Sequence, residues 1–155
     1  MTTITTTDPT SEQHQRGQTS AFYVAFIALG LAFSSLGPTL PSLADNTGST
    51  LGQISILFTA QSLGLLIGNF LSGRLYDRRP AFPFLAAVVL VTAAMLALVP
   101  LMSSLPLLAT LLFIMGAAAG SIDVGGNTML VWIHGDQVGP RMNALHFFFG
   151  GGALL

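Results

Sequence analysis

The sequence predicts an all-α membrane protein, and three observations support this fold class. Apolar residues make up 52% of the 155 residues, whereas charged residues make up only 7%. A soluble domain carries about a quarter charged residues, so this chain has too few of them to form a water-facing surface. The mean hydropathy is +0.73, and long apolar stretches recur along the chain. Because hydrocarbon leaves no water for backbone polar groups, such stretches form helices.

The composition also excludes several classes of function. The chain has no cysteine, so disulfides and thiolate metal sites are excluded. Its net charge is −1 and it contains no lysine, which argues against a nucleic-acid partner. The three histidines, His14, His134 and His146, show no metal-site spacing, and no cofactor is expected. No Ser-His-Asp signature or phosphate-binding loop is present, so the chain is not expected to be an enzyme.

Four stretches reach the roughly 20 residues that a membrane-spanning helix needs. They cover residues 21–40, 51–75, 81–102 and 106–133. The first is expected to end at Pro38 and Pro41, and Thr50 is expected to cap the second. A fifth apolar stretch, 142–155, is only about four turns long and is interpreted as an incomplete span. Residues 1–20 are polar and rich in threonine, and they are predicted to form a disordered cytoplasmic tail.

The distribution of positive charge predicts the orientation in the membrane. If the chain crosses at each span, the tail, the second-to-third loop and the fourth-to-fifth loop lie on one side. These three segments hold all five arginines: Arg16, Arg74, Arg78, Arg79 and Arg141. The positive-inside rule assigns that side to the cytoplasm. We therefore expect a multi-pass protein with a cytoplasmic N-terminus. Its membrane is expected to be the plasma membrane.

One carboxylate, Asp123, lies inside the fourth apolar stretch. A charge at the centre of a bilayer costs about 2.5–3.5 kcal/mol on insertion scales, and intramembrane ionisable residues are functional candidates by default. Asn127 follows four residues later and shares its helix face. That face is expected to point into a bundle or an aqueous cavity. The favoured interpretation is a protonatable or solute-binding group, and the alternative is a hydrogen bond to a neighbouring helix.

Further polar residues within the apolar stretches extend the candidate set. Asn143 and His146 are three residues apart on the fifth stretch, and Gln61 lies on the second. Taken singly, each is interpreted as forming an interhelical hydrogen bond, and the alternative is that it binds the solute or a proton. The same two interpretations apply to Ser34, Ser35 and Asn69.

Small residues recur at every fourth position on two of the predicted spans. They are Ala60, Gly64, Gly68 and Ser72 on the second and Gly116 and Gly120 on the fourth. Such a spacing lets helix backbones approach closely, so these faces are expected to pack against neighbouring helices.

The stretch "GRLYDRRP", from Gly73 to Pro80, resembles the signature loop of the major facilitator superfamily. Gly73, Asp77 and Arg78 match that signature, whereas Pro80 replaces its second glycine. The resemblance implies a gating loop in which Asp77 engages a helix end in the other half of a transporter. A carboxylate near a helix N-terminus is electrostatically favourable.

Two other stretches resemble the branch of this superfamily that contains fucose permease and sodium-dependent glucose transporter-like proteins. They are "LGPTLPSLADNTG" after the first span and "GSIDVGGN…NALHFFFGGGALL" across the fourth and fifth. The resemblance implies a twelve-helix fold of two six-helix halves, with the solute bound between them near the midplane. We then expect the chain to be the N-terminal part of such a protein, with four spans and a truncated fifth.

The resemblance implies a secondary active transporter for a sugar or a similar small polar solute, working by alternating access. Its partners would be the lipid bilayer, the solute and a coupling proton or sodium ion. In that branch, proton coupling uses carboxylates on the first and fourth helices, and here Asp123 is the counterpart on the fourth. Two alternatives remain: a drug/proton antiporter of the same superfamily, and a non-transporting membrane scaffold or subunit.

Overall fold

The computed structural model describes residues 9–78 and 80–155, and every regular element in these ranges is a helix. The elements are α1 (Pro9–Thr47), α2 (Leu51–Ile54), α3 (Ile56–Arg78), α4 (Ala81–Leu98), η1 (Val99–Leu101), α5 (Leu105–His134), η2 (Gly135–Gln137) and α6 (Val138–Ala153). Four helical stretches are long and apolar enough to cross a membrane: Gln13–Thr47, Leu51–Arg78, Ala81–Leu101 and Leu105–Ala153. The last of these runs through η2 and includes α6.

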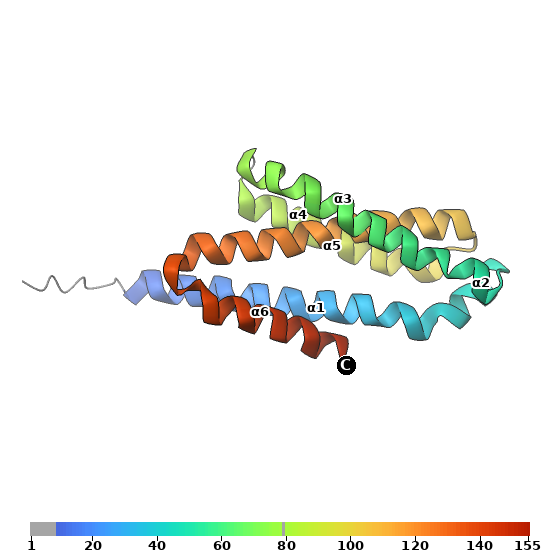
Figure 1. Cartoon of the computed structure of the whole chain (residues 1–155), viewed down its shortest axis with the longest axis horizontal. Helices are drawn as coiled ribbons and strands as arrows, with labels where there is room; N and C mark the ends of the chain where they lie inside the picture. Colours follow the sequence, from blue (N-terminus) through green and yellow to red (C-terminus); the bar gives the residue numbers. More distant parts are fainter. Residues whose placement is uncertain (1–8, 79) are drawn as a thin grey trace, which may run out of the picture.

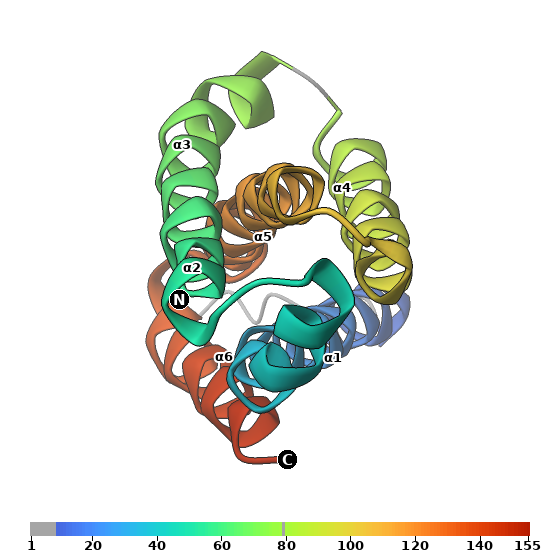
Figure 2. The same ribbon diagram turned by 90° about the vertical axis from the view of Figure 1, so that its right-hand side faces the viewer.

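The helices run back and forth along one common direction, as Figure 1 shows. α1 and α6 lie side by side, and α3 and α4 lie on the other side of the bundle. The end-on view in Figure 2 shows α5 between α3 and α4, with the α1–α6 pair below it. Because α5 lies at the centre, it has more buried residues than any other described helix.

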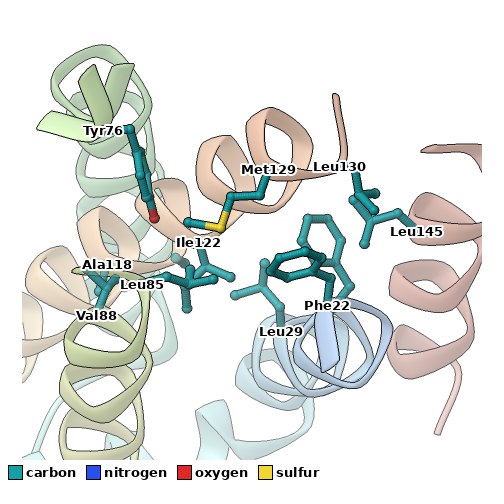
Figure 3. Packing of buried hydrophobic residues seen from close by; sticks show 12 residues of the cluster. Phe22, Leu29, Tyr76, Leu85, Val88, Ala118, Ile122, Met129, Leu130 and Leu145 are labelled. Atoms are coloured by element: carbon teal, nitrogen blue, oxygen red, sulfur yellow. The ribbon is translucent and has the colours of Figure 1, made fainter. Parts of the chain in front are cut away.

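A cluster of apolar side chains joins the α1–α6 pair to the other three helices (Figure 3). Phe22 and Phe26 of α1 pack with Met129 and Leu130 of α5, and Leu145 adds the contribution of α6. A second cluster, around Leu36, Leu57 and Leu108, fills the opposite end of the bundle. Elsewhere large apolar side chains remain exposed, especially on α3 and α4, as lipid contact requires.

Glycines bring α3 and α5 into backbone contact. A Cβ atom placed on Gly64 would collide with the carbonyl oxygen of Phe113, and one on Gly68 with that of Ala117. From the other helix, a Cβ on Gly116 would collide with the carbonyl oxygen of Gln61. The predicted role of the small-residue faces in close helix packing is therefore confirmed at these positions.

The prediction of a disordered tail is wrong for residues 9–20, which form the first turns of α1. Residues 1–8 lie outside the described residues. The helix persists because its polar turns have a docking partner. Thr19 is only 7% exposed, and its hydroxyl lies 2.8 Å from Nε2 of His134, at the end of α5, and 2.8 Å from the carbonyl oxygen of Gln15.

The prediction that the first span ends near residue 40 is also wrong, since α1 continues through both prolines to Thr47. Each proline removes one helical hydrogen bond. The Thr39 hydroxyl donates to the carbonyl oxygen of Ser35 at 2.8 Å, which adds a local tie in this region. Beyond the prolines, Leu43 is buried in the second apolar cluster. Packing of this last part of α1 therefore outweighs the loss of two backbone bonds.

The other boundaries differ less from those expected. The second span is divided at Ser55 into α2 and α3, and α6 begins at Val138 instead of residue 142. α5 covers Leu105–His134, one residue beyond the expected range at each end. Thr50 caps α2 as predicted: its Oγ1 accepts from the Gln53 backbone N–H at 3.2 Å, and Gln53 Oε1 accepts from the Thr50 N–H at 3.0 Å.

We expect Thr19→Val to loosen the start of α1 without unfolding the bundle. The substitution keeps the shape of the side chain but removes the hydroxyl that contacts His134, at a cost of about 1 kcal/mol. Hydrogen–deuterium exchange should then speed up over residues 13–20 and stay unchanged in the middle of α5. The matched control is Thr110→Val, whose exposed hydroxyl bonds to the Pro106 carbonyl within its own helix. Equal exchange rates over residues 13–20 in the two variants would contradict the interpretation that the contact of Thr19 with His134 holds the start of α1 in place.

Candidate functional site

Asp123 and Asn127 form a hydrogen-bonded pair on α5. The Asn127 side-chain N–H donates to Oδ1 of Asp123 at 3.1 Å and to the Asp123 backbone carbonyl at 2.9 Å. The shared face predicted from their four-residue spacing is therefore confirmed. The Asn127 Oδ1 atom is buried and has no hydrogen-bond partner among the described residues. It remains available as an acceptor.

Asp123 lines a cavity of about 230 Å³ between α5 and the α1–α6 pair. His146 of α6 lines the same cavity, so the structure brings together two candidates that are 23 positions apart in the sequence. The remaining lining is apolar and largely aromatic: Phe26, Leu29 and Phe33 from α1, Leu65 from α3 and Phe149 from α6. The His146 and Phe26 rings meet edge to face, with their centres 6.2 Å apart.

The arrangement combines hydrogen-bonding groups with aromatic surfaces. A carboxylate accepts hydrogen bonds from hydroxyl groups, and an imidazole donates or accepts. Phenylalanine rings offer apolar faces against which a flat apolar patch of a polar molecule can pack. Pockets for drug-sized ligands usually measure about 300–1,000 Å³, so this cavity suits a smaller molecule.

Two other candidate residues lie away from this cavity. Gln61 is 4% exposed and lies in the close α3–α5 contact, where its own carbonyl oxygen faces Gly116. Its Nε2 atom is buried without a partner among the residues described, as is Oδ1 of Asn69. Asn143 is exposed on α6, one turn before His146, and is not among the residues that line the cavity.

The two serines of α1 are engaged with their own helix. The Ser34 hydroxyl donates to the Leu31 carbonyl at 3.1 Å, and the Ser35 hydroxyl donates to the Ala32 carbonyl at 3.0 Å. Neither serine lines the cavity beside Asp123.

The signature residues Gly73, Asp77 and Arg78 lie exposed at the end of α3. Arg78 lines a separate surface cavity of about 550 Å³, together with Leu75, Pro80, Pro83 and Phe84. This cavity lies at the α3–α4 connection, so the structure keeps the signature loop apart from the Asp123 cavity.

Within residues 9–78 and 80–155, no group of three or more His, Asp or Glu side chains could hold a metal ion. The Asp123 carboxylate, the Asn127 amide and the His146 imidazole offer hydrogen-bond donors and acceptors.

Sequence reasoning missed the aromatic lining of the cavity. Phe26 and Phe33 are seven residues apart, two helical turns, and therefore lie on one face of α1. That spacing is visible in the sequence, but in an apolar span it does not separate a cavity wall from an ordinary packing face. The contacts of Tyr76 and Ser72 with Ser121 were also missed, because each joins two helices.

Comparison with known proteins places the chain in a family. Residues 22–155 match the family description "Major Facilitator Superfamily". The chain is 37% identical over 133 residues to the "Sodium-dependent glucose transporter 1A" of Mus musculus, a match that covers 86% of this chain and 31% of that protein. It is also 37% identical over 131 residues to the Homo sapiens "Sodium-dependent glucose transporter 1", covering 84% of this chain and 25% of the relative.

A third relative is the "Major facilitator superfamily domain-containing protein 4B" of Danio rerio, 37% identical over 139 residues, with 88% of this chain and 26% of the relative covered. The chain thus spans about a quarter to a third of the length of these relatives. No solved structure matches it. The family match over most of the chain, together with long apolar helices and no described strand, shows that the chain is an all-α, multi-pass membrane protein and belongs to the Major Facilitator Superfamily.

Proposed function

We propose that this chain forms part of a secondary active transporter, not an enzyme, that carries a sugar or a similar small polar solute by alternating access. The observation that carries the proposal is the Asp123 carboxylate on a small, aromatic-walled cavity between α5 and the α1–α6 pair. The named glucose transporters among its relatives support the same class of solute.

The position of the charge supports a role on a solute pathway. Asp123 lies in the second half of a 30-residue apolar helix, where a carboxylate is costly unless it meets water, a partner or a ligand. Among the described residues, the Asp123 side chain accepts a hydrogen bond from Asn127, and it lines the same cavity as His146. A polyhydroxylated solute would supply hydroxyl donors to the carboxylate and an apolar face to the phenylalanine rings.

The coupling ion in this proposal is a proton or sodium, and Asp123 is its binding group in either case. A carboxylate can bind a proton directly, or it can provide oxygen ligands to a hard cation. Asn127 and His146 would assist in holding the ion or the solute. Gln61 and Asn143 stay proposed as solute contacts in a different conformation, since neither lines the cavity in the described one.

Alternating access requires one half of a transporter to move against another around the site. Because the chain spans about a quarter to a third of its relatives, the proposal assigns the second wall of the pathway to further helices of a longer protein. The signature residues Gly73, Asp77 and Arg78 would then contact that second half at the α3–α4 connection.

We further propose that the N-terminus is cytoplasmic and that the membrane is the plasma membrane. Figure 1 shows that the start of α1, the end of α3, the start of α4 and the α5–α6 junction lie at one end of the bundle. Among the described residues, Arg16 lies near the start of α1, Arg74 and Arg78 lie in the last turns of α3, and Arg141 lies near the start of α6. The opposite end carries the α1–α2 and α4–α5 connections, which contain no arginine. Positive charge gathered at one end supports a cytoplasmic location for that end.

The test is solute uptake by the complete transporter in cells that lack their own sugar carriers. We expect uptake of a labelled monosaccharide, driven by an imposed sodium or proton gradient and abolished when that gradient is collapsed. Efflux of cationic drugs without sugar uptake would favour the antiporter alternative. No movement of either class, in protein shown to reach the membrane, would favour a scaffold or subunit and reject the proposal.

A further inference from the structure

Tyr76 lies near the end of α3 and is almost completely buried, with 3% of its surface exposed. Figure 3 shows its side chain pointing from α3 toward α5. Its hydroxyl donates a hydrogen bond to the backbone carbonyl of Ser121 at 2.9 Å. On α4, the Phe84 ring packs edge to face against it, with the ring centres 4.9 Å apart. Tyr76 therefore joins three helices at one point.

Ser72, one turn earlier on α3, reaches the same residue of α5. Its hydroxyl donates to Oγ of Ser121 at 2.6 Å, and the Ser121 hydroxyl in turn donates to the Ala117 carbonyl at 3.0 Å. Ser72 is 2% exposed. Two hydrogen bonds from α3 thus converge on Ser121, two residues before Asp123.

The Tyr76 hydroxyl also lies against Gly125, two residues after Asp123. A Cβ atom at Gly125 would collide with that hydroxyl, so the contact needs glycine there. Ser121 and Gly125 are four residues apart and share one face of α5. Asp123 lies between them, roughly 200° around the helix, and so faces the opposite way. Tyr76 therefore contacts one face of this turn of α5, and Asp123 lies on the opposite face, which lines the cavity.

We propose that Tyr76 is a positioning residue for Asp123. By fixing the Ser121 carbonyl and filling the space beside Gly125, it sets the rotation of this turn of α5 and hence the direction of the carboxylate. The effect of this position on solute affinity rests on the proposed function, whereas its effect on the carboxylate itself does not.

The test compares Tyr76→Phe with Tyr23→Phe in the complete transporter. Both changes remove one hydroxyl and keep the ring. Tyr23 is a matched control, because its hydroxyl donates to the Arg141 carbonyl, at 3.4 Å, between α1 and α6 and makes no hydrogen bond to α5 among the described residues. The probe is a membrane-permeant carbodiimide, which modifies carboxyl groups, and its reaction at Asp123 is measured by peptide mass spectrometry.

We expect Tyr76→Phe to raise the rate of carbodiimide labelling at Asp123 about three- to tenfold, the range that loss of one interhelical hydrogen bond gives in a membrane. Tyr23→Phe should leave that rate unchanged. In uptake assays, Tyr76→Phe should raise the KM for the solute with the same amount of protein in the membrane. A merely structural role would lower thermal stability without a selective change at Asp123.

Ser72→Ala provides a second variant if Tyr76→Phe is not recovered as folded protein. It removes the neighbouring bond to Ser121 and should also accelerate labelling. Labelling rates equal to that of the unaltered protein in every folded variant would overturn the proposal. Faster labelling in a protein that moves no sugar would support positioning by Tyr76 and reject the proposed function, so the two failures are distinguishable.

Discussion

Replacing Asp123 by asparagine is expected to abolish gradient-driven uptake by the complete transporter, with a loss on the order of 100-fold. Hydrogen bonds to charged groups contribute about 1.5–3 kcal/mol each, and this carboxylate is the proposed binding group for the coupling ion. Asparagine has nearly the same shape and keeps an acceptor for the Asn127 side-chain N–H, so folding should survive. The measurement is initial uptake rate per transporter at the cell surface, with and without the gradient.

The matched control for this prediction is Asp136→Asn. Asp136 is exposed in the η2 turn at the end of the bundle, so the same chemical change removes a carboxylate outside the cavity. We expect near-normal uptake in that variant. If Asp123→Asn also retains its full gradient-driven uptake, Asp123 has no part in coupling, and its role is reduced to the bond with Asn127.

Replacing Gly68 by alanine is expected to destabilise the bundle by about 1–3 kcal/mol, the usual cost of overpacking. The added methyl group would occupy the position of the Ala117 backbone, so α3 and α5 must separate along their contact. The loss of close packing along a helix interface removes dispersion contacts that hold helices together where lipid provides no hydrophobic drive. The melting temperature of the detergent-solubilised protein should fall accordingly.

Gly152→Ala and Gly151→Ala on α6 form a matched pair for the same argument. A Cβ at Gly152 would collide with the Ile27 carbonyl oxygen, whereas one at Gly151 has nothing within 4 Å. We expect Gly152→Ala to destabilise the α1–α6 contact and Gly151→Ala to leave stability unchanged or improve it, because alanine favours helix by up to about 1 kcal/mol. Equal melting temperatures for the two variants would contradict the argument that the close contact at Gly152 leaves no room for a side chain.

At both ends of α1, the local sequence predicted the wrong helix boundary. Residues 9–20 have the composition of a disordered tail, yet Thr19 is held against His134 of α5. Pro38 and Pro41 have the chemistry of a helix end, yet Leu43 beyond them is buried in the core. In each case a contact with a residue far away in the sequence decides the local structure, and no local pattern contains that contact.

In the candidate site, too, some features follow from the local sequence and others depend on contacts between helices. The spacing of Asp123 and Asn127 was enough to place both on one face, and their hydrogen bonds follow from it. His146 and Gln61 looked equivalent in the sequence as single polar residues within apolar spans. The structure places His146 beside the Asp123 cavity and Gln61 in the α3–α5 contact, because the packing of helix against helix sets which faces meet.

The sequence by itself determined that this is a helical membrane protein, where its long apolar helices lie to within a few residues over most of the chain, and which helix carries a carboxylate. These properties depend on hydropathy and on periodicity within one helix, which are local. Only the tertiary structure decided that Phe26, Phe33 and Phe149 line the same cavity as this carboxylate and that Tyr76 contacts the opposite face of its helix. Those arrangements depend on how closely backbones approach at particular glycines, and that distance is a property of pairs of helices.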